Sequence, residues 1–245
     1  SHIHCLKQKH VKCLNQVWKD RDLSIATIKN RNAMLRWTCK KINKKNVVPS
    51  NEDLGIGKRT YLTNVNKAVD IKSISREIIT NKNVWVQIHL QRYLGLRREE
   101  AIKFKPHKAD HKNFIRLDPS WCKGGRGRDV PILTREARYW IDEAKKLAKN
   151  PNDSLVPKGK NYIMARHIYD KQLYRAGVKH PHGLRHAYAQ EKYRELTGWN
   201  CPACGGPTYK ELTEKQKKID YDARLKISLL LGHSRVQIVS NYCGK

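Results

Sequence analysis

A tyrosine near the end of the chain follows a Gly-His corner that could build a nucleophilic site. The apolar pair Leu230-Leu231 leads into Gly232 and His233, and Tyr242 comes nine residues after the histidine. A tyrosine hydroxyl is a poor nucleophile, because a pKa of about 10 leaves only about one group in a thousand ionised at neutral pH. Ionising it costs roughly 4 kcal/mol, which basic or cationic neighbours must offset. The chemistry therefore depends on whether distant segments supply such neighbours.

One candidate neighbour stands where one helix is expected to stop and another to begin. Gly95 suits a helix C-cap, and Arg97 follows it at the start of the next helical segment. Anions bind well at such a helix start. Glu100 comes one turn later and could hold a guanidinium group or cap the helix. Taken alone, the pair also fits an exposed helix start with simple charge pairing.

A second candidate is the motif His182-Gly183-Leu184-Arg185. In a helix, His182 and Arg185 lie one turn apart on one face, so an imidazole and a guanidinium can converge on one phosphate. His186 points to a neighbouring face, and we interpret it as a hydrogen-bonded structural residue.

A basic turn between two short strands supplies a third group. Residues 114–117 and 128–132 predict a small antiparallel hairpin around a glycine-rich segment at 121–127. Lys123 could reach a phosphate or a DNA groove from this turn. We expect Arg126, Arg128 and Arg98 to bind the DNA backbone. The GxxxxGK[ST] spacing of a phosphate-binding P-loop is missing.

The composition favours a polyanionic partner. The 245 residues include 51 Lys and Arg but 22 Asp and Glu, a formal net charge of +29. Nucleic acid fits this excess, because neutralising phosphates releases counterions. An anionic membrane surface is the alternative, but we find no long apolar span, signal peptide or lipidation motif. The seven cysteines are odd in number and mostly scattered, which indicates reduced thiols in a cytoplasm.

Helical periodicity dominates the elements that must position these residues. Residues 3–69 read as a small basic helical domain, in which Asp22 is a candidate N-cap. Further helices are expected over 78–94, 134–149 and 162–176. The expected fold is mainly α with a small antiparallel β-sheet (α+β), divided into residues 1–70 and 71–245.

The order of these motifs resembles the tyrosine recombinases, the phage-integrase family. The resemblance covers residues 73 to 242, and the interval from His233 to Tyr242 is the one that family uses. The helical N-terminal segment is similar to the family's core-binding DNA-binding domain in position, size and charge. The elements that carry the resemblance are Gly95-Leu96-Arg97 with Glu100, Lys123, His182-Gly183-Leu184-Arg185, Leu231-Gly232-His233 and Tyr242.

The resemblance implies a site-specific recombinase or integrase of a mobile genetic element. Tyr242 would attack a DNA phosphodiester and form a 3′-phosphotyrosyl intermediate. The resemblance implies that Arg97 and Arg185 clamp the transition state and that Lys123 is the general acid. It implies that His182 accepts a proton and that His233 donates a hydrogen bond to the phosphate. Glu100 would be a supporting carboxylate. No metal or nucleotide cofactor is required, because the phosphotyrosine conserves the bond energy.

The implied partners are double-stranded DNA recombination sites, a homo-tetramer assembled on them, and accessory DNA-bending proteins. The expected location is the cytoplasm, with the nucleoid as the site of action in a bacterium. Two alternatives remain open: a type IB topoisomerase-like enzyme that relaxes DNA, and a DNA-binding protein with an idle site.

An insert is expected at about residues 191–222, and it contains Cys201-Pro202-Ala203-Cys204-Gly205. Cys-x-x-Cys before glycine is half of a zinc knuckle. The second pair of ligands is missing nearby, so a turn with two free thiols is favoured over zinc.

Overall fold

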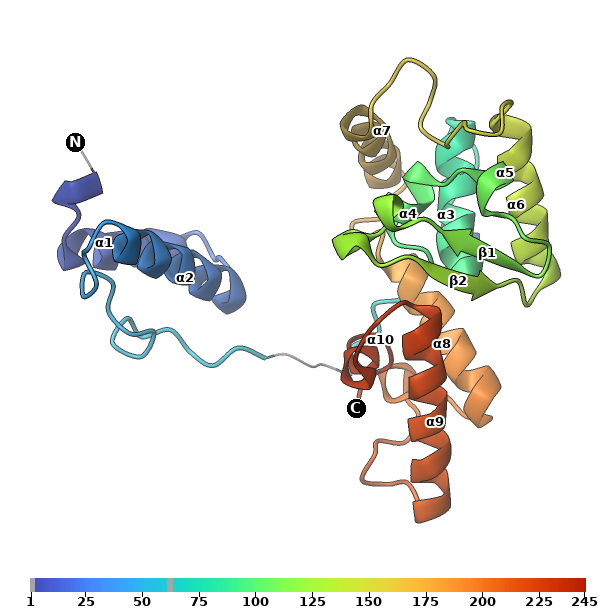
Figure 1. Cartoon of the computed structure of the whole chain (residues 1–245). Helices are drawn as coiled ribbons and strands as arrows, with labels where there is room; N and C mark the ends of the chain where they lie inside the picture. Colours follow the sequence, from blue (N-terminus) through green and yellow to red (C-terminus); the bar gives the residue numbers. More distant parts are fainter. Residues whose placement is uncertain (1–2, 61–63) are drawn as a thin grey trace. The chain divides into compact units, whose positions relative to one another are not determined.

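The computed structural model describes residues 3–60 and 64–245, and the chain forms two compact units, residues 1–61 and 62–245 (Figure 1). The first contains η1 (Ile3–Cys5), α1 (Gln8–Asp20) and α2 (Ile25–Lys41). The second contains η2 (Ile71–Ser73), α3 (Lys82–Leu94), α4 (Arg98–Lys103), α5 (Pro106–Ala109), β1 (Phe114–Leu117), η3 (Pro119–Trp121), η4 (Lys123–Gly125), β2 (Arg128–Pro131), α6 (Arg135–Leu147), α7 (Tyr162–Arg175), α8 (Gly183–Thr197), η5 (Pro202–Cys204), α9 (Glu214–Leu230), η6 (Val236–Val239) and α10 (Ser240–Cys243). The expected mainly α fold with a small antiparallel sheet is confirmed.

The first unit is a helix pair closed by its own C-terminal segment. One small apolar cluster joins Val11 to Cys39 and Val48, and a second is built around Ile28. Between the helices, the buried amides of Asn15 and Asn32 exchange two hydrogen bonds of 3.0 and 2.8 Å. A paired amide satisfies the polar atoms that burial would otherwise leave unpartnered, so this pair fixes the register of α1 against α2.

Asp22 does not cap α2, so the expected N-cap was wrong. The chain turns at Asp22 with a φ of 52°, and the helix begins only after Ser24. The Ser24 hydroxyl accepts a hydrogen bond from the Thr27 amide at 3.2 Å. The backbone turn therefore moves the start of the helix two residues beyond Asp22, because the capping side chain must stand next to the first helical turn.

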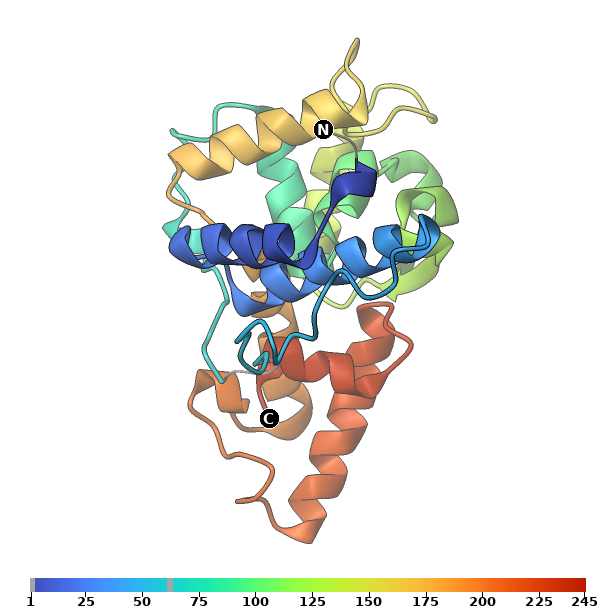
Figure 2. The same cartoon turned by 90° about the vertical axis from the view of Figure 1, so that its left-hand side faces the viewer.

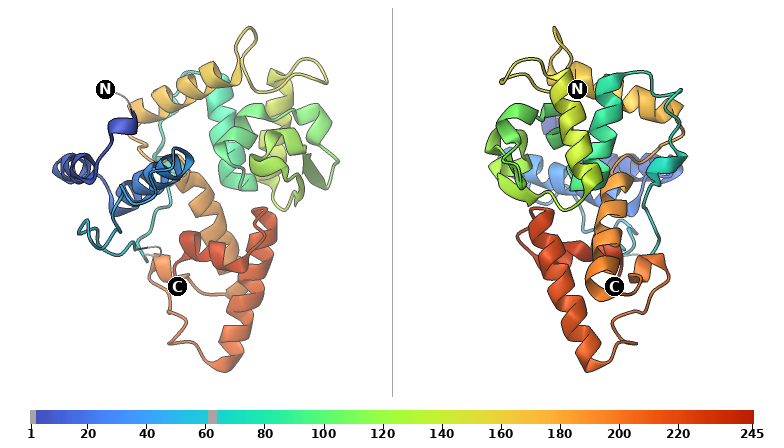
Figure 3. Two further views of the ribbon diagram at one scale, coloured as in Figure 1. Left: turned by 60° about the vertical axis from the view of Figure 1, so that its left-hand side comes forward. Right: turned by 90° about the vertical axis from the view of Figure 1, so that its right-hand side faces the viewer.

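Helix α3 is the central element of the second unit. It packs against α6 on one side and α8 on another, and α4 and α7 also contact it (Figure 3). Its start lies later than the apolar pattern from Ile78 predicted, because Asn81 forms the N-cap and accepts from the Val84 amide at 3.1 Å. Ile79 is fully buried in the turn before the helix. The helix ends at Gly95, whose left-handed φ of 62° confirms the predicted C-cap.

The predicted hairpin is present as the two-stranded antiparallel sheet β1–β2. Ile115 pairs with Val130, and Leu117 pairs with Arg128. The turn between the strands contains η3 and η4. Because side chains alternate between the two faces of a strand, Arg128 and Val130 share the face that turns toward the interior.

The C-terminal end of the second unit is built by α8, α9 and α10 around one apolar cluster that includes Tyr188, Ile227, Leu231 and Tyr242. The segment between α8 and α9, part of the expected insert, runs close to the C-terminus (Figure 2). Within the ranges 3–60 and 64–245, no helix has both the length and the apolar character to cross a membrane.

Residues 64–70 belong to this second unit rather than to the helix pair. The Val69 amide donates to the Gly183 carbonyl at 3.1 Å, and Asn64 exchanges hydrogen bonds with the backbone of Lys245. A Cβ at Gly183 would lie 2.5 Å from Val69 Cγ2, so only glycine lets this segment lie against the start of α8. The segment therefore packs beside the end of the chain that carries Tyr242.

Candidate active site

The hydroxyl of Tyr242 lies among three nitrogen atoms from two separate parts of the chain, the start of α8 and the segment after α9. Tyr242 Oη is 3.3 Å from His182 Nε2, 3.3 Å from Arg185 Nε and 3.3 Å from His233 Nε2. The tyrosine is 5% exposed on the short helix α10. A phenol, two imidazoles and a guanidinium group thus meet around one oxygen, within reach for hydrogen bonding and proton transfer.

Arg185 is completely buried, and the backbone fixes its guanidinium group. It donates to the carbonyl of Gly95, to the carbonyl of Leu231 at 2.5 Å and to Tyr242 Oη. Burial lowers the pKa of Arg185 to about 10, which still leaves it a cation at neutral pH. The two carbonyls stand where α3 and α9 end, so these helix ends set the position of the guanidinium group.

Glu100 is the buried counter-ion of three arginines. It receives two hydrogen bonds from Arg128, at 2.8 and 2.9 Å, and one from Arg97 Nη1 at 2.6 Å. Arg185 Nη1 lies 4.0 Å from the same carboxylate. Burial alone would raise the pKa of Glu100, but hydrogen bonds and positive charge from Arg128, with the charges of Arg97 and Arg185, lower it to about 2. Glu100 is therefore ionised and holds the arginines together.

Arg97 reaches the site from the N-terminus of α4. Its amide donates to Glu100 at 2.7 Å, and its Nη2 is 3.4 Å from the Gly232 carbonyl. With its side chain 22% exposed, Arg97 can still offer N–H groups to a bound anion. Gly232 takes a φ of 66°, and a Cβ there would lie 2.6 Å from Arg128 Cδ, so this corner requires glycine.

Both site histidines are neutral at neutral pH. Burial, followed by the charge of Arg185, lowers the pKa of His182 to about 4, and the same two causes lower the pKa of His233 to about 4. A neutral imidazole can accept a proton on one nitrogen and donate from the other. The two residues therefore suit proton transfer and hydrogen bonding.

Lys123 lies in η4, in the exposed turn of the hairpin. It lines a hollow of about 360 Å³ together with Arg97, Glu100 and His182. The structure thus brings the six candidate catalytic residues and Glu100 to one place, although they come from five separate parts of the chain.

The three arginines expected to bind DNA have different surroundings. Arg126 is exposed in the hairpin turn, and Arg98 is partly exposed and paired with Asp170 at 2.7 Å. Arg128 has a side chain only 8% exposed and uses both terminal nitrogens to bind Glu100. Its Nε also donates to the Leu230 carbonyl at 3.2 Å. Because the side chain is almost completely buried and all three nitrogens already donate to protein groups, we interpret Arg128 as a positioning residue rather than a backbone binder.

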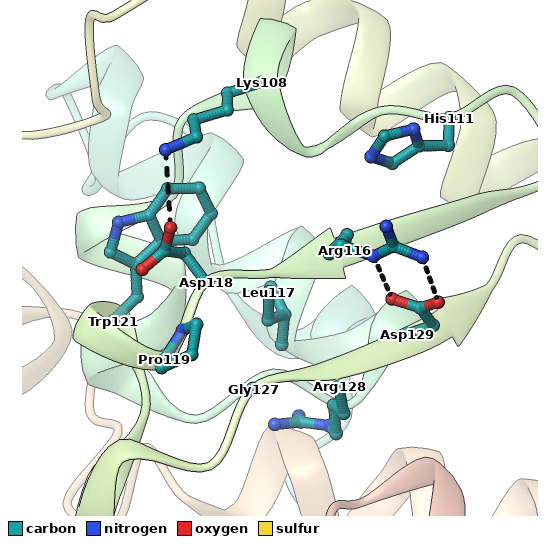
Figure 4. A pocket seen from close by; sticks show the side chains of 10 residues that line it. All are labelled: Lys108, His111, Arg116, Leu117, Asp118, Pro119, Trp121, Gly127, Arg128 and Asp129. Carbon is teal, nitrogen blue, oxygen red and sulfur yellow. Dashed lines mark hydrogen bonds and ion pairs between the residues drawn. The ribbon is translucent and has the colours of Figure 1, made fainter.

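A larger hollow, of about 780 Å³, lies over the hairpin (Figure 4). Two ion pairs line it, Arg116 with Asp129 at 2.8 Å and Lys108 with Asp118 at 3.3 Å. Both cations already have carboxylate partners, and carboxylates repel a phosphate. In the smaller hollow, by contrast, Lys123 has no carboxylate partner among the residues that the structure describes.

Two side chains hold the backbone of the nucleophile: sequence reasoning predicted a hydrogen-bonded structural role for His186 without its partner, and it missed Gln190. The Tyr242 carbonyl accepts from Gln190 Nε2 at 3.0 Å and from the ring of His186, whose centroid lies 4.7 Å from the tyrosine ring. Both residues come from α8. The helical steps from Arg185 to His186 and Gln190 were visible in the sequence, but the carbonyl they meet is more than fifty residues away. No local pattern reveals that contact.

The Cys201–Cys204 knuckle has no metal cage around it. In the part of the chain that the structure describes, no group of three or more His, Cys, Asp or Glu side chains is arranged to hold a metal ion. All seven cysteines are free thiols, and these two lie in the turn around η5.

Comparison with known proteins gives one family and one fold. Residues 63–191 match the model of the integrase family. No curated protein sequence matches the chain. Among solved structures, it is similar to the Tn1549 transposon integrase in complex with circular intermediate DNA, at 15% identity over 97% of this chain and 81% of that one, with a TM-score of 0.56.

Two further structures share the fold. The XerH site-specific recombinase bound to a palindromic difH substrate has 17% identity over 98% of this chain and 69% of its own, with a TM-score of 0.61. A lambda integrase dimer bound to a COC′ core site has 12% identity over 99% of this chain and 81% of its own, with a TM-score of 0.58.

Proposed function

The chain belongs to the integrase family, and we propose that it is a site-specific DNA recombinase that cleaves and rejoins DNA through a 3′-phosphotyrosyl intermediate. One observation carries the proposal: Tyr242 Oη lies 3.3 Å from His182 Nε2, Arg185 Nε and His233 Nε2. A protein that only binds DNA has no need of a buried phenol surrounded in this way. The DNA-bound state of the three similar structures supports the same substrate.

The first step is attack by the tyrosine. An oxygen–phosphorus bond forms between Tyr242 Oη and the scissile phosphate while the phenolic proton passes to His182, which is neutral because burial holds its pKa to about 4. The two imidazole nitrogens and Arg185 Nε surround the oxygen from which the proton leaves. Preformed groups of this kind lower the barrier, because they need no rearrangement during the reaction.

The transition state concentrates negative charge on the non-bridging phosphate oxygens. Arg97 and Arg185 supply two guanidinium groups whose planar forks match pairs of oxygens. His233 adds a neutral donor to the phosphate. Glu100 fixes Arg97 and Arg128 and does not contact the DNA, because it is completely buried.

The leaving group is the 5′-oxygen of the broken strand. Lys123 in the exposed hairpin turn is the general acid that protonates this oxygen as the phosphorus–oxygen bond breaks. The products are a 3′-phosphotyrosyl bond and a free 5′-hydroxyl. Attack by the 5′-hydroxyl of a second strand reverses each step, releases Tyr242 and joins the new pair of ends.

The helical unit of residues 1–61 acts as the family's core-binding domain and provides additional basic surface for the duplex. Recombination needs two cleaved sites at once, so we assign a homo-tetramer on paired DNA sites, aided by DNA-bending proteins. We assign this recombinase to a mobile genetic element. The substrate places its action in the cytoplasm, on the nucleoid in a bacterial host.

The chemistry is tested with a nicked suicide duplex, which loses its 5′-end after cleavage and traps the intermediate. The wild-type chain should form a covalent protein–DNA adduct, and Tyr242→Phe should form none while binding the duplex with unchanged affinity. Binding without any adduct from the wild-type chain would leave a DNA-binding protein with an idle site.

Recombination is separated from simple relaxation on a plasmid with two candidate sites. Exchange of flanking markers is expected from a recombinase. Relaxed circles as the sole product would instead indicate a topoisomerase-like enzyme. DNA affinity should also fall steeply with salt concentration, since phosphate contacts release counterions.

A further inference from the structure

Three thiols lie directly behind the nucleophile, and the proposed mechanism uses none of them. Cys201 is the N-cap of η5, Cys204 is the last residue of η5, and Cys243 follows Tyr242 in the sequence. The thiols of Cys243 and Cys204 are the neighbours that act most strongly on the pKa of the Cys201 thiol. Cys201 and Cys243 are almost completely buried in the apolar cluster that also contains Tyr242, whereas Cys204 is partly exposed.

The backbone brings the first two sulfurs together. The Cys204 amide donates to the Cys201 carbonyl at 2.8 Å, which closes a 3₁₀ turn. Side chains three residues apart eclipse one another in such a turn. The turn is also rigidly closed, since a Cβ at Gly206 would lie 1.6 Å from the Asn200 carbonyl oxygen.

A single amide connects this pair to the nucleophile. Cys204 Sγ donates to Gln190 Oε1 at 3.2 Å, while Gln190 Nε2 donates to the Tyr242 carbonyl and to Asn66 Oδ1, both at 3.0 Å. The thiol hydrogen of Cys204 thus helps to orient the amide that holds Tyr242. The end of α10 also touches the turn, because the site of a Cβ at Gly244 lies 2.8 Å from the Ala203 nitrogen.

The electrostatics make one sulfur of the pair reactive. The neighbouring Cys243 thiol, followed by Cys204 and the backbone amides of the turn, outweighs burial and lowers the pKa of Cys201 to about 6. Burial and the neighbouring Cys201 raise the pKa of Cys204 to about 11. Thiolate at one position and thiol at the next is the arrangement of a reactive Cys-x-x-Cys pair.

We propose that Cys201 and Cys204 are a dithiol oxidation site, at which a hydroperoxide forms a disulfide that releases Gln190 and loosens the helix carrying Tyr242. The Cys201 thiolate attacks the peroxide, so a sulfur–oxygen bond forms, the oxygen–oxygen bond breaks and hydroxide leaves, which becomes water by taking up the proton that Cys201 lost when it ionised. The Cys204 sulfur then attacks Cys201 and loses its proton, the sulfur–oxygen bond breaks and a second water leaves. The thiols are oxidised by two electrons, hydrogen peroxide is reduced to two waters, and an external dithiol reverses the reaction.

The consequence for DNA cleavage rests on the proposed function, whereas the chemistry of the thiols does not. A disulfide at Cys204 has no hydrogen to donate, so Gln190 Oε1 loses this partner. Gln190 can then turn away from the Tyr242 carbonyl. Misplacing a nucleophile by about 1 Å can cost on the order of a hundredfold in rate.

The test uses the full chain with the exposed Cys5 and Cys13 changed to serine, so that they do not react. After treatment with hydrogen peroxide, tryptic digestion separates residues 195–210, which hold both Cys201 and Cys204, from residues 236–245, which hold Cys243. The first peptide should lose two hydrogen atoms, and dithiothreitol should restore them. A cross-link between the two peptides, or no change in mass, would overturn the proposal.

Two readouts follow the nucleophile. Amide hydrogen exchange in residues 236–245 should become faster on oxidation, and suicide-duplex adducts should form roughly ten- to a hundredfold more slowly. Cys204→Ser keeps a hydroxyl donor for Gln190, so neither readout should respond to peroxide in that variant. Unchanged exchange in the oxidised wild-type background would refute the link to Tyr242.

Two outcomes are kept apart by this design. If the reduced chain forms no adduct at all, the proposed function fails, but the mass and exchange measurements still decide the thiol proposal. If the purified chain carries stoichiometric zinc that protects both thiols, the pair is a metal site and the oxidation proposal is wrong.

Discussion

The floor of the site and the tip of the hairpin are built in opposite ways. The floor, formed by Glu100, Arg128 and Arg185, is buried, and its charged groups are paired with one another or with backbone carbonyls. The tip, formed by Lys123 and Arg126, is exposed on a turn in which Gly124 and Gly125 take positive φ angles. The groups that hold a fixed charge geometry are buried and paired, whereas Lys123, the proposed general acid, stands on a solvent-exposed turn.

Loss of Arg185 should have the largest effect, because this residue belongs to the buried floor and is also one of the two arginines proposed to clamp the phosphate. Arg185→Ala leaves the carbonyls of Gly95 and Leu231 without their donor and should cost about 3–5 kcal/mol in the free energy of unfolding. The rate of adduct formation should fall by about 10²–10³-fold. Urea unfolding and suicide-duplex kinetics measure the two effects. Arg185→Lys keeps a charge but loses the planar fork, so full activity in that variant would contradict the clamp.

Glu100→Gln should mainly destabilise the fold. Removing one buried carboxylate leaves Arg97 and Arg128 without their shared counter-ion, at a cost of about 3–5 kcal/mol. The matched control is Glu99→Gln, whose partner Lys103 is on the surface, and it should cost less than about 1 kcal/mol. Equal melting temperatures for the two variants would show that Glu100 is not a structural counter-ion.

Lys123→Ala should affect the tip alone. The rate of adduct formation should fall by about 10²–10⁴-fold, as for loss of a general acid, while the free energy of unfolding stays within about 0.5 kcal/mol of wild type. A duplex with a bridging sulfur at the 5′-position should restore the rate, because a thiolate leaves without being protonated. Lys158→Ala, an exposed lysine far along the chain, serves as the control. Failure of the sulfur substrate to rescue would exclude Lys123 as the acid.

As the pH falls, the free energy of unfolding should decrease because buried histidines become protonated, at a pH well above the one that protonates Glu100. Burial lowers the pKa of both His89 and His182 to about 4 in the folded chain, whereas the pKa of a histidine in the unfolded chain is about 6.5. Their contribution is complete above about pH 6.5 and is lost as the pH falls toward about 4, because the unfolded chain binds the protons first. We expect a loss of about 1 kcal/mol for each histidine between pH 7 and pH 5, after allowance for solvent screening.

Urea unfolding at pH 7, 6 and 5 measures this loss. Glu100 stays ionised over the whole range, because its pKa is about 2. His89→Gln should flatten the dependence, and replacing the exposed His180 should not. A stability that does not change between pH 7 and pH 5 would contradict the burial of neutral histidines.

Arg126→Ala should give the smallest effect. One phosphate contact fewer should reduce the slope of log affinity against log salt by about one. Cleavage at saturating protein should remain unchanged, as measured with the suicide duplex. A large loss of cleavage would place Arg126 in the chemistry rather than on the DNA backbone.

The floor and the tip also differ in how far the sequence could predict them. The corners at Gly95 and Gly232 and the hairpin were predictable, because glycine and strand alternation act locally. That alternation also puts Arg128 on the same face as buried Val130, and applying it would have shown that Arg128 faces the interior. Its pairing with Glu100 is a contact across 28 positions, and no local pattern specifies it.

Other differences have equally physical causes. The apolar pattern from Ile78 predicts a longer helix than α3, because Ile79 is buried by a turn rather than by helical periodicity. Asp22 and Ser24 are both good caps, and the backbone turn between α1 and α2 decides between them. Gln190 and the thiols behind Tyr242 depend on how the last helix packs, which is a tertiary property.

The imbalance of charge at the floor has one more consequence. Three guanidinium groups, from Arg97, Arg128 and Arg185, share the single carboxylate of Glu100, so their positive charges exceed the negative charge and repel one another. The phosphodiester of the proposed substrate would add negative charge there, and relief of this repulsion would contribute to its binding. Target duplex, or even a simple oxyanion at sufficient concentration, should therefore stiffen and stabilise the protein. Folding and substrate recognition are in this sense one coupled equilibrium.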